Sequence, residues 1–291
     1  MDSTRKSLIA GIEESLPRMS KGQKAIAAFI LSDYDQAAYL TAASIGDTVG
    51  VSESTVVRFA MEMGFEGFPH FQKALKEELK VKMTAVQRLH ASGRLAGSED
   101  ILGSVLLADA DRLRRASDSA DRGRFRQAVD IILAARRIFI VGVRSSAPLA
   151  SFMDFYFKYI FDDVRLLNPT GASDMLEQIM PASQGDVVIG ISFPRYSKRT
   201  IDAMKYSRSA GAAVIAITDK DGTPVSQVAD CLLLAPSDMM SFVDSLTAPM
   251  SVITALIVAL GLRQKDHVSQ NLEKLEHLWD EYDVYDKGGA G

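Results

Sequence analysis

Two short segments combine serine hydroxyls with arginine, a set of groups suited to holding an anion. One runs Gly-Val-Arg-Ser-Ser over residues 142–146, and the other runs Ser-Phe-Pro-Arg-Tyr-Ser over residues 192–197. Each follows a short apolar run and precedes a helical pattern, where free backbone N–H groups and hydroxyls bind phosphate well. The candidate effector-binding residues are Arg144, Ser145, Ser146, Ser192, Arg195 and Ser197. A serine in such a loop also serves simply to cap the next helix, but an arginine in both loops favours anion binding.

A second polar set has the spacing of a DNA-recognition helix. Residues 41–49 predict a first helix, Gly50 its left-handed end, and Ser52 the N-cap of a second helix. The second helix carries an apolar stripe at i, i+4 and i+7, which leaves hydroxyls and one arginine on another face. The candidate DNA-binding residues are Lys21, Ser52, Ser54, Thr55, Arg58 and Lys73. The alternative is an ordinary helical hairpin with a solvated polar face.

The elements around the serine loops alternate between strand and helix patterns. Short apolar, β-branched runs lie at residues 136–142, 164–168, 186–192, 212–218 and 231–235. Helical patterns between them predict a parallel sheet with helices on both faces. Ligands bind such sheets at the carboxyl ends of the strands, so we expect both serine loops at one edge.

The elements around the recognition helix form a helical bundle of about five helices. Ser20 and Gln23 have the spacing of a capping box, and the chain restarts as a helix after Gly67. We expect a DNA-binding domain at 1–82, a polar linker at 83–105 and a ligand-binding and dimerisation domain at 106–285. The fold class is therefore α followed by α/β.

Composition restricts the partners. The chain has 291 residues, a net charge of −4 and a hydrophobic content of 47%, enough for two packed cores but without a basic field for non-specific DNA binding. A specific reader whose affinity rises through dimerisation is compatible with that charge. The single cysteine, Cys231, rules out a disulfide within the chain and is expected in a buried strand.

The sequence also predicts a cytoplasmic protein without metal or cofactor. The first residues have acidic groups where a signal peptide needs an apolar core. The apolar run 246–262 is interrupted by Pro249, so a buried or subunit-interface helix is expected rather than a membrane span. The four histidines are scattered and lack metal-ligand spacing.

The N-terminal segments SKGQKAIAAFIL and VSESTVVRFAMEMGFEGFPHFQKAL resemble the helix-turn-helix domain of the RpiR family of bacterial transcriptional regulators, over about residues 5–80. Residues 120–260 resemble the sugar isomerase (SIS) domain that follows it in that family. This resemblance implies a doubly wound, five-stranded sheet, phosphosugar binding at the serine loops, and a homodimer or homotetramer. By position, Ser146, Ser192 and Ser197 match serines of the family's two loops, and Asp219 matches the aspartate after the fourth strand.

This sequence departs from the family pattern in both loops. Arg144 stands where the family usually has its second glycine, and Pro194 and Arg195 stand where it usually has serine and glycine. Pro194 removes a hydroxyl and a backbone N–H donor from the phosphate cradle. The surplus of arginine favours a ligand with additional negative charge, such as a phosphorylated sugar acid.

The resulting hypothesis is a regulator, not an enzyme, which binds double-stranded operator DNA and senses a phosphosugar or related small anion. One alternative is a phosphosugar isomerase, for which Glu177 is a candidate base. Another is a regulator with a vestigial effector pocket, which Pro194 favours. The C-terminal segment 269–285 is expected to pack on the sheet domain or a partner subunit, and 286–291 to form a disordered tail.

Overall fold

The computed structural model describes residues 8–82, 84–91, 99–167 and 174–285. The chain divides into two compact units, Met1–Ser92 and Gly93–Gly291, with the boundary inside the predicted linker 83–105. Parts of that segment are helical, since α7 spans Ala85–Ala91 and α9 (Ile101–Ser119) begins within it. The rest of the linker at 92–98 and the predicted tail at 286–291 lie outside the described residues.

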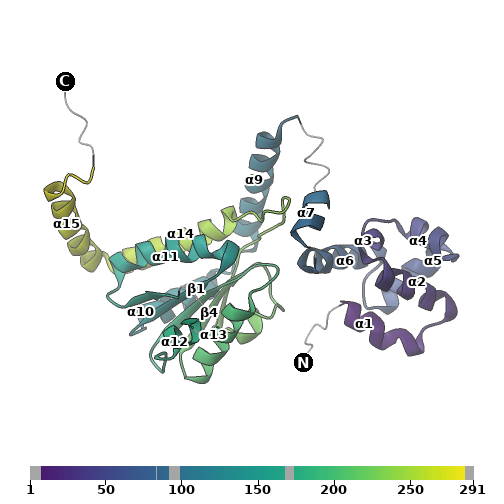
Figure 1. The fold of residues 1–291 in the computed structure, drawn as a ribbon, viewed down its shortest axis with the longest axis horizontal. Helices are drawn as coiled ribbons and strands as arrows, with labels where there is room; N and C mark the ends of the chain where they lie inside the picture. Colours follow the sequence, from purple (N-terminus) through teal and green to yellow (C-terminus); the bar gives the residue numbers. More distant parts are fainter. Residues whose placement is uncertain (1–7, 83, 92–98, 168–173, 286–291) are drawn as a thin grey trace. The chain divides into compact units, whose positions relative to one another are not determined.

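The first unit is helical throughout its described part (Figure 1). Before α7 it contains α1 (Leu8–Ser15), the 3-10 turn η1 (Leu16–Arg18), α2 (Lys21–Ser32), the one-turn α3 (Tyr34–Ala37), α4 (Ala42–Val49), α5 (Glu53–Glu62) and α6 (Phe68–Lys82). The predicted capping box starts α2, where Ser20 N donates to Gln23 Oε1 at 2.8 Å and Ser20 Oγ accepts from Gln23 N. Phe71 is fully buried, with the edges of Phe59 and Phe65 against it at 5.7 and 5.4 Å between ring centroids. These contacts anchor α6 on α5.

The second unit is built on a five-stranded, all-parallel sheet, as predicted. Its strands are β1 (Ile138–Gly142), β2 (Val164–Leu166), β3 (Val187–Ile191), β4 (Ala213–Thr218) and β5 (Cys231–Leu234), in the order β2-β1-β3-β4-β5. The strand order reverses direction after β1, which is the doubly wound arrangement. Cys231 is buried in β5, in agreement with its expected position.

Helices cover both faces of the sheet because strand residues alternate between two apolar clusters (Figure 1). One face packs against α10 (Arg122–Leu133), α11 (Ala147–Ile160) and α14 (Thr247–Arg263). The other packs against α12 (Asp174–Ile179) and α13 (Lys198–Ser209). In β1, for example, Ile138 and Ile140 face the first group and Phe139 and Val141 the second.

The two C-terminal helices differ in burial. Helix α14 buries apolar residues in the core, as expected for the run 246–262. Helix α15 (Lys265–Glu281) contains no buried residue and is fixed to α11 by a hydrogen bond from Asn271 Nδ2 to the carbonyl of Tyr159 at 3.2 Å. Among the described residues no single helix has the length and apolarity of a membrane span; α14 and α15 reach it only together, with a 99° bend between them.

A charged cluster closes the amino end of the sheet. The Asp186 side chain is fully buried and accepts hydrogen bonds from Arg137 Nη2 at 2.7 Å and Arg136 Nε at 3.1 Å. The Ser183 amide donates to the same carboxylate at 2.9 Å. Because Arg136 and Arg137 immediately precede β1 and Asp186 precedes β3, the cluster ties the two central strands together at their start.

Candidate functional site

The predicted helix-turn-helix is formed by α4 and α5. Thr41 caps α4, since its Oγ1 accepts from the Ser44 amide at 3.1 Å. The helix ends at Gly50, whose φ of 73° is left-handed, and the Val51 amide then donates to the carbonyl of Gly46 at 2.9 Å. This bond turns the chain sharply, so that only three residues separate α4 from α5.

The tight turn depends on a glycine inside α4. A Cβ at Gly46 would lie 2.7 Å from the Val51 carbonyl oxygen and 3.3 Å from the Glu53 amide nitrogen, both of them backbone atoms. We expect Gly46→Ala to destabilise the first unit by about 1–3 kcal/mol, because backbone cannot move aside as a flexible side chain can. Amide hydrogen exchange in α4 and α5 measures this, with Gly67→Ala as control, since its Cβ would meet only Pro69 Cδ at 3.8 Å. Equal exchange in both variants would contradict the packing argument.

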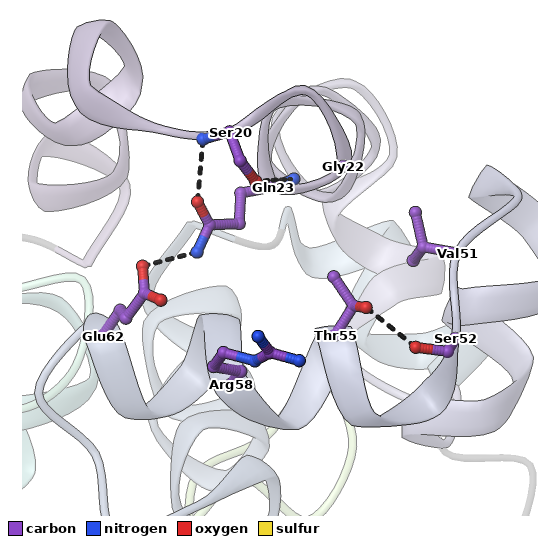
Figure 2. Close-up of a pocket in the computed structure, with 8 residues that line it drawn as sticks. All are labelled: Ser20, Gly22, Gln23, Val51, Ser52, Thr55, Arg58 and Glu62. Atoms are coloured by element: carbon purple, nitrogen blue, oxygen red, sulfur yellow. Dashed lines mark hydrogen bonds between the residues drawn. The ribbon is translucent and has the colours of Figure 1, made fainter.

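A groove opens between the start of α2, the turn and α5 (Figure 2). Gln23 spans it, since its Nε2 donates to the Glu62 carboxylate while its Oε1 accepts from Ser20 N. The Arg58 guanidinium rises from α5 into the groove between Thr55 and Glu62. The lining residues are Ser20, Gly22, Gln23, Val51, Ser52, Thr55, Arg58 and Glu62.

The structure brings together only some of the predicted DNA-binding residues. Ser52, Thr55 and Arg58 line the groove, whereas Ser54 and Lys21 are exposed beside it. Lys73 is exposed on α6 and does not line the groove.

The predicted N-cap position of Ser52 is confirmed, but its hydroxyl bonds other side chains. Ser52 occupies the N-cap position of α5, but its hydroxyl makes no capping bond. It pairs instead with Ser54 Oγ at 2.9 Å and Thr55 Oγ1 at 2.8 Å, because three hydroxyls within one turn compete for the same partners. The result is a cluster of hydroxyls at the start of α5.

Two groove residues were missed from the sequence. Gln23 carried only the signal of a helix cap, and Glu62 only that of a solvated face next to Arg58. Their hydrogen bond joins residues 39 positions apart and holds α2 against α5. Glu62 also places a negative charge in the groove, which disfavours a phosphate close to it and directs anions towards Arg58.

In the second unit, strand register places the two serine loops side by side. Gly142 at the end of β1 pairs with Ile191 at the end of β3, so both loops leave the sheet at the same level. A Cβ at Gly142 would lie 2.8 Å from the Ser146 carbonyl oxygen. Glycine therefore allows the first loop to fold back tightly over the strand end.

The first loop forms the 3-10 turn η2 (Arg144–Ser146). Arg144 and Ser145 are exposed, while Ser146 is 4% exposed. The Ser146 side chain makes no capping bond to α11, so capping does not account for this serine.

The second loop uses its serines internally. The buried Ser192 accepts from the Ser197 amide at 3.0 Å, and Ser197 Oγ accepts from the Thr200 amide at 3.4 Å as the cap of α13. Capping therefore accounts for Ser197, as the alternative interpretation allowed. Arg195 is exposed at the tip of this loop.

Both loop arginines have left-handed backbone conformations, with φ values of 56° for Arg144 and 64° for Arg195. Glycine adopts this conformation freely, but for a residue with a Cβ it costs about 1–2 kcal/mol of conformational free energy. Strain of this kind persists where function requires the side chain. The structure thus explains why glycine suits these positions and shows that arginine occupies them at a cost.

Three further residues at this edge, Tyr196, Asp219 and Thr200, were not among the predicted effector-binding residues. The Tyr196 hydroxyl donates to Asp219 Oδ1 at 2.9 Å, joining the second loop to the end of β4. Burial raises the pKa of the Asp219 carboxyl, although the Tyr196 hydrogen bond opposes the shift. The Thr200 hydroxyl in the first turn of α13 is fully buried and, within the described chain, has no hydrogen-bond partner. No group of three or more His, Cys, Asp or Glu side chains in the described residues could hold a metal ion.

Comparison with known proteins agrees with this two-part organisation. Residues 6–82 match the model of the helix-turn-helix domain of the rpiR family, and residues 131–259 match that of the SIS domain. The chain is 26% identical over 280 residues to the HTH-type transcriptional regulator HexR of Escherichia coli strain K12, covering 93% of each protein.

Two solved structures share the fold. The sugar isomerase domain of an RpiR transcription factor from Sphaerobacter thermophilus has a TM-score of 0.59 and 21% identity, covering 62% of this chain and 99% of that one. The Vibrio vulnificus NanR protein complexed with ManNAc-6P has a TM-score of 0.58 and 20% identity, covering 93% and 98%. With an rpiR-type helix-turn-helix domain followed by a SIS domain, the chain belongs to the RpiR family of transcriptional regulators.

Proposed function

We propose that this protein is a cytoplasmic transcriptional regulator that binds operator DNA through the α5 groove and senses a phosphosugar or related anion. The DNA-binding part is supported by Arg58 and the hydroxyl cluster at the start of α5. A dimer or tetramer would present two such helices to half-sites about 10 bp apart or a multiple of that. Affinity for the promoter region of its own gene, measured by a mobility-shift assay, tests this part and should fall steeply with salt.

The effector part depends on one observation above all, the pair of left-handed arginines on adjacent strand-end loops. Two guanidinium groups at one edge suit a ligand with more than one negative group, such as a phosphorylated sugar acid. NanR, which shares the fold, was solved with a phosphosugar, which supports this ligand class for the present chain. Ligand would bind one arrangement of the dimer better than another and so change operator affinity.

Thermal unfolding with N-acetylmannosamine 6-phosphate, glucose 6-phosphate and 6-phosphogluconate tests the effector part. A ligand at a hundredfold excess over its Kd should stabilise the protein by about 2.7 kcal/mol. A flat response across a broad panel of sugar phosphates and sugar acids would favour the vestigial pocket instead.

We expect Arg144→Gly and Arg195→Gly each to weaken binding of the responding ligand roughly 10- to 100-fold, the loss of one charge-assisted contact. Their stability should stay unchanged or rise by up to about 1 kcal/mol, because glycine relieves the backbone strain. Calorimetric titration measures the affinity, and Lys205→Ala, an exposed charge on α13, serves as control. Unaltered affinity in the double arginine variant would place the ligand elsewhere.

A further inference from the structure

Helix α9 is held to the loop between β5 and α14 by polar groups. Asp109 accepts from Ser245 Oγ at 2.6 Å and Thr247 Oγ1 at 2.9 Å, and pairs with Arg112 Nη1 at 2.9 Å. Arg115 Nη2 bonds Asp238 Oδ2 at 2.7 Å. We call this cluster the α9 latch; it consists of Asp109, Arg112 and Arg115 of α9, Asp238, Met240 and Ser245 of the loop, and Thr247 at the start of α14.

Helix α9 is held in place by the polar contacts of the latch and not by burial of apolar side chains. Arg112 is the one residue of α9 classed as buried, at 5% exposure. Large apolar residues of the same helix remain open, with Leu102 at 71% and Leu107 at 75% exposure. Since little apolar surface is lost when α9 moves, its position depends on the hydrogen bonds of the latch.

The latch contains one buried donor without a hydrogen bond, and an acceptor lies near it. Asp238 Oδ2 forms ion pairs with both arginines, at 2.7 Å from Arg115 Nη2 and at 3.8 Å from Arg112 Nε, and Arg112 Nε is buried without a hydrogen bond. A small shift of α9 along the loop would bring Asp238 within hydrogen-bond distance of Arg112 Nε. Arg115, which is half exposed, would keep its pair with Asp111 at 3.0 Å. A buried donor left unsatisfied costs free energy, which offsets part of the stability that the Arg115–Asp238 bond provides.

Hydrogen bonds also connect the latch to the strand-end loops where we propose that the effector binds. Its loop begins at the end of β5, where the Ala235 amide donates to the Thr218 carbonyl at 2.9 Å. Asp219 follows directly and binds Tyr196 of the second serine loop. Farther along, Ser237 Oγ donates to the Ser245 carbonyl at 3.0 Å, next to the Asp109 contact. In the described chain, α9 is the first helix after the boundary with the DNA-binding unit.

We infer that the α9 latch couples the strand-end loops to α9. When a ligand binds at these loops, the hydrogen bond of Asp238 changes from Arg115 to Arg112. The inference deepens the proposed function and rests on it for the ligand. Asp109, Arg112 and Asp238 are positioning residues that touch no ligand and transmit its presence to the helix leading towards the DNA-binding unit. Coupling of this kind requires an element with two discrete states, which the alternative partners of Asp238 supply.

Amide hydrogen exchange on the full chain tests the latch itself. We expect Asp109→Asn to raise exchange at least tenfold in α9 around residues 105–116 and in the loop 237–247. The matched control is Asp118→Asn, the same change on an exposed site of the same helix, which should alter exchange less than twofold. If Asp109→Asn weakens folding of the whole unit, Ser245→Ala removes a single donor and should act in the same segments. Unchanged exchange in both latch variants would overturn the inference.

Mobility-shift assays then test the coupling, with whichever of the three sugar phosphates raises the unfolding temperature. The parent should change operator affinity at least fivefold on binding it. Asp109→Asn should reduce that change below twofold while retaining affinity for the sugar phosphate within threefold. Retention of the full change, or loss of sugar-phosphate binding itself, would overturn the inference.

If no compound raises the unfolding temperature of the parent, the proposed effector function fails. The coupling between the strand-end loops and α9 is then tested without a ligand. Tyr196→Phe removes the Tyr196–Asp219 hydrogen bond at the edge and should then raise exchange in α9 at least threefold. Exchange in α9 equal to that of the parent would overturn the coupling as well.

Discussion

Replacement of Arg58 by alanine is expected to weaken operator binding roughly 10- to 100-fold, the effect of losing one well-placed base or phosphate contact. Arg58 is the cation that lines the α5 groove, and Glu62 beside it repels phosphate and adds no attraction. With a net charge of −4, the chain has no general positive field to compensate for the loss. A mobility-shift titration over several salt concentrations measures the effect.

The control is Arg126→Ala, which removes the same side chain from an exposed site on α10 in the second unit. It should alter DNA affinity less than twofold. Arg58→Lys separates two kinds of contact, because lysine retains attraction to phosphate but loses the planar fork that reads guanine. Binding of Arg58→Ala as tight as that of the parent would show that α5 is not the recognition helix.

Replacement of Asp186 by alanine is expected to destabilise the second unit by about 3–5 kcal/mol, the cost of breaking a buried ion pair on one side. The variant leaves the Arg137 guanidinium, 18% exposed, without its carboxylate. It also removes the acceptor of the Ser183 amide. Because the cluster ties β1 to β3, hydrogen exchange of the amides in these strands reports the loss directly.

A surface pair provides the comparison. Asp130 lies 3.5 Å from Arg263, and both side chains are more than 60% exposed. Asp130→Ala should therefore cost less than about 0.5 kcal/mol, because solvent screens the pair. A similar cost for both variants would contradict the assignment of Asp186 as the tie between the central strands.

The Asp186 contribution also depends on pH. Burial by itself would raise the pKa of this carboxyl, but hydrogen bonds from Arg137, Ser183 and Arg136 lower it below the ordinary value. A folded-state pKa below the unfolded value of about 3.9 means that the stabilisation is complete above that pH and disappears as pH falls through the folded pKa. The stability difference between parent and Asp186→Ala should thus be constant from pH 7 to about 5 and shrink in stronger acid.

Local signals made most of the fold predictable. The Ser20–Gln23 capping box, Gly50 between α4 and α5, and the five apolar strand runs act over a few residues, so their effect is visible in sequence alone. The sequence predicts a strand over 164–168, whereas β2 ends at Leu166; residue 168 lies outside the described residues. The end of an edge strand depends on its neighbour more than on its own residues.

The sites were predictable only in their residue types. The sequence shows that arginine and serine lie at the strand ends and in α5. It does not show which partner each of these side chains bonds. Ser197 caps a helix, Ser52 bonds other hydroxyls, and Lys73 lies away from the groove. Each outcome depends on which partner comes within 3 Å once the backbone is folded.

The sequence by itself determined that this is a helix-turn-helix chain joined to a parallel sheet with arginine and serine residues at one edge. The tertiary structure alone decided the left-handed backbone of Arg144 and Arg195, the Gln23–Glu62 bond across the groove, and the contact of Asp109 with Ser245. The last pair is 136 positions apart. No local pattern encodes such contacts, because they form only when the packing of whole helices and strands brings distant side chains together.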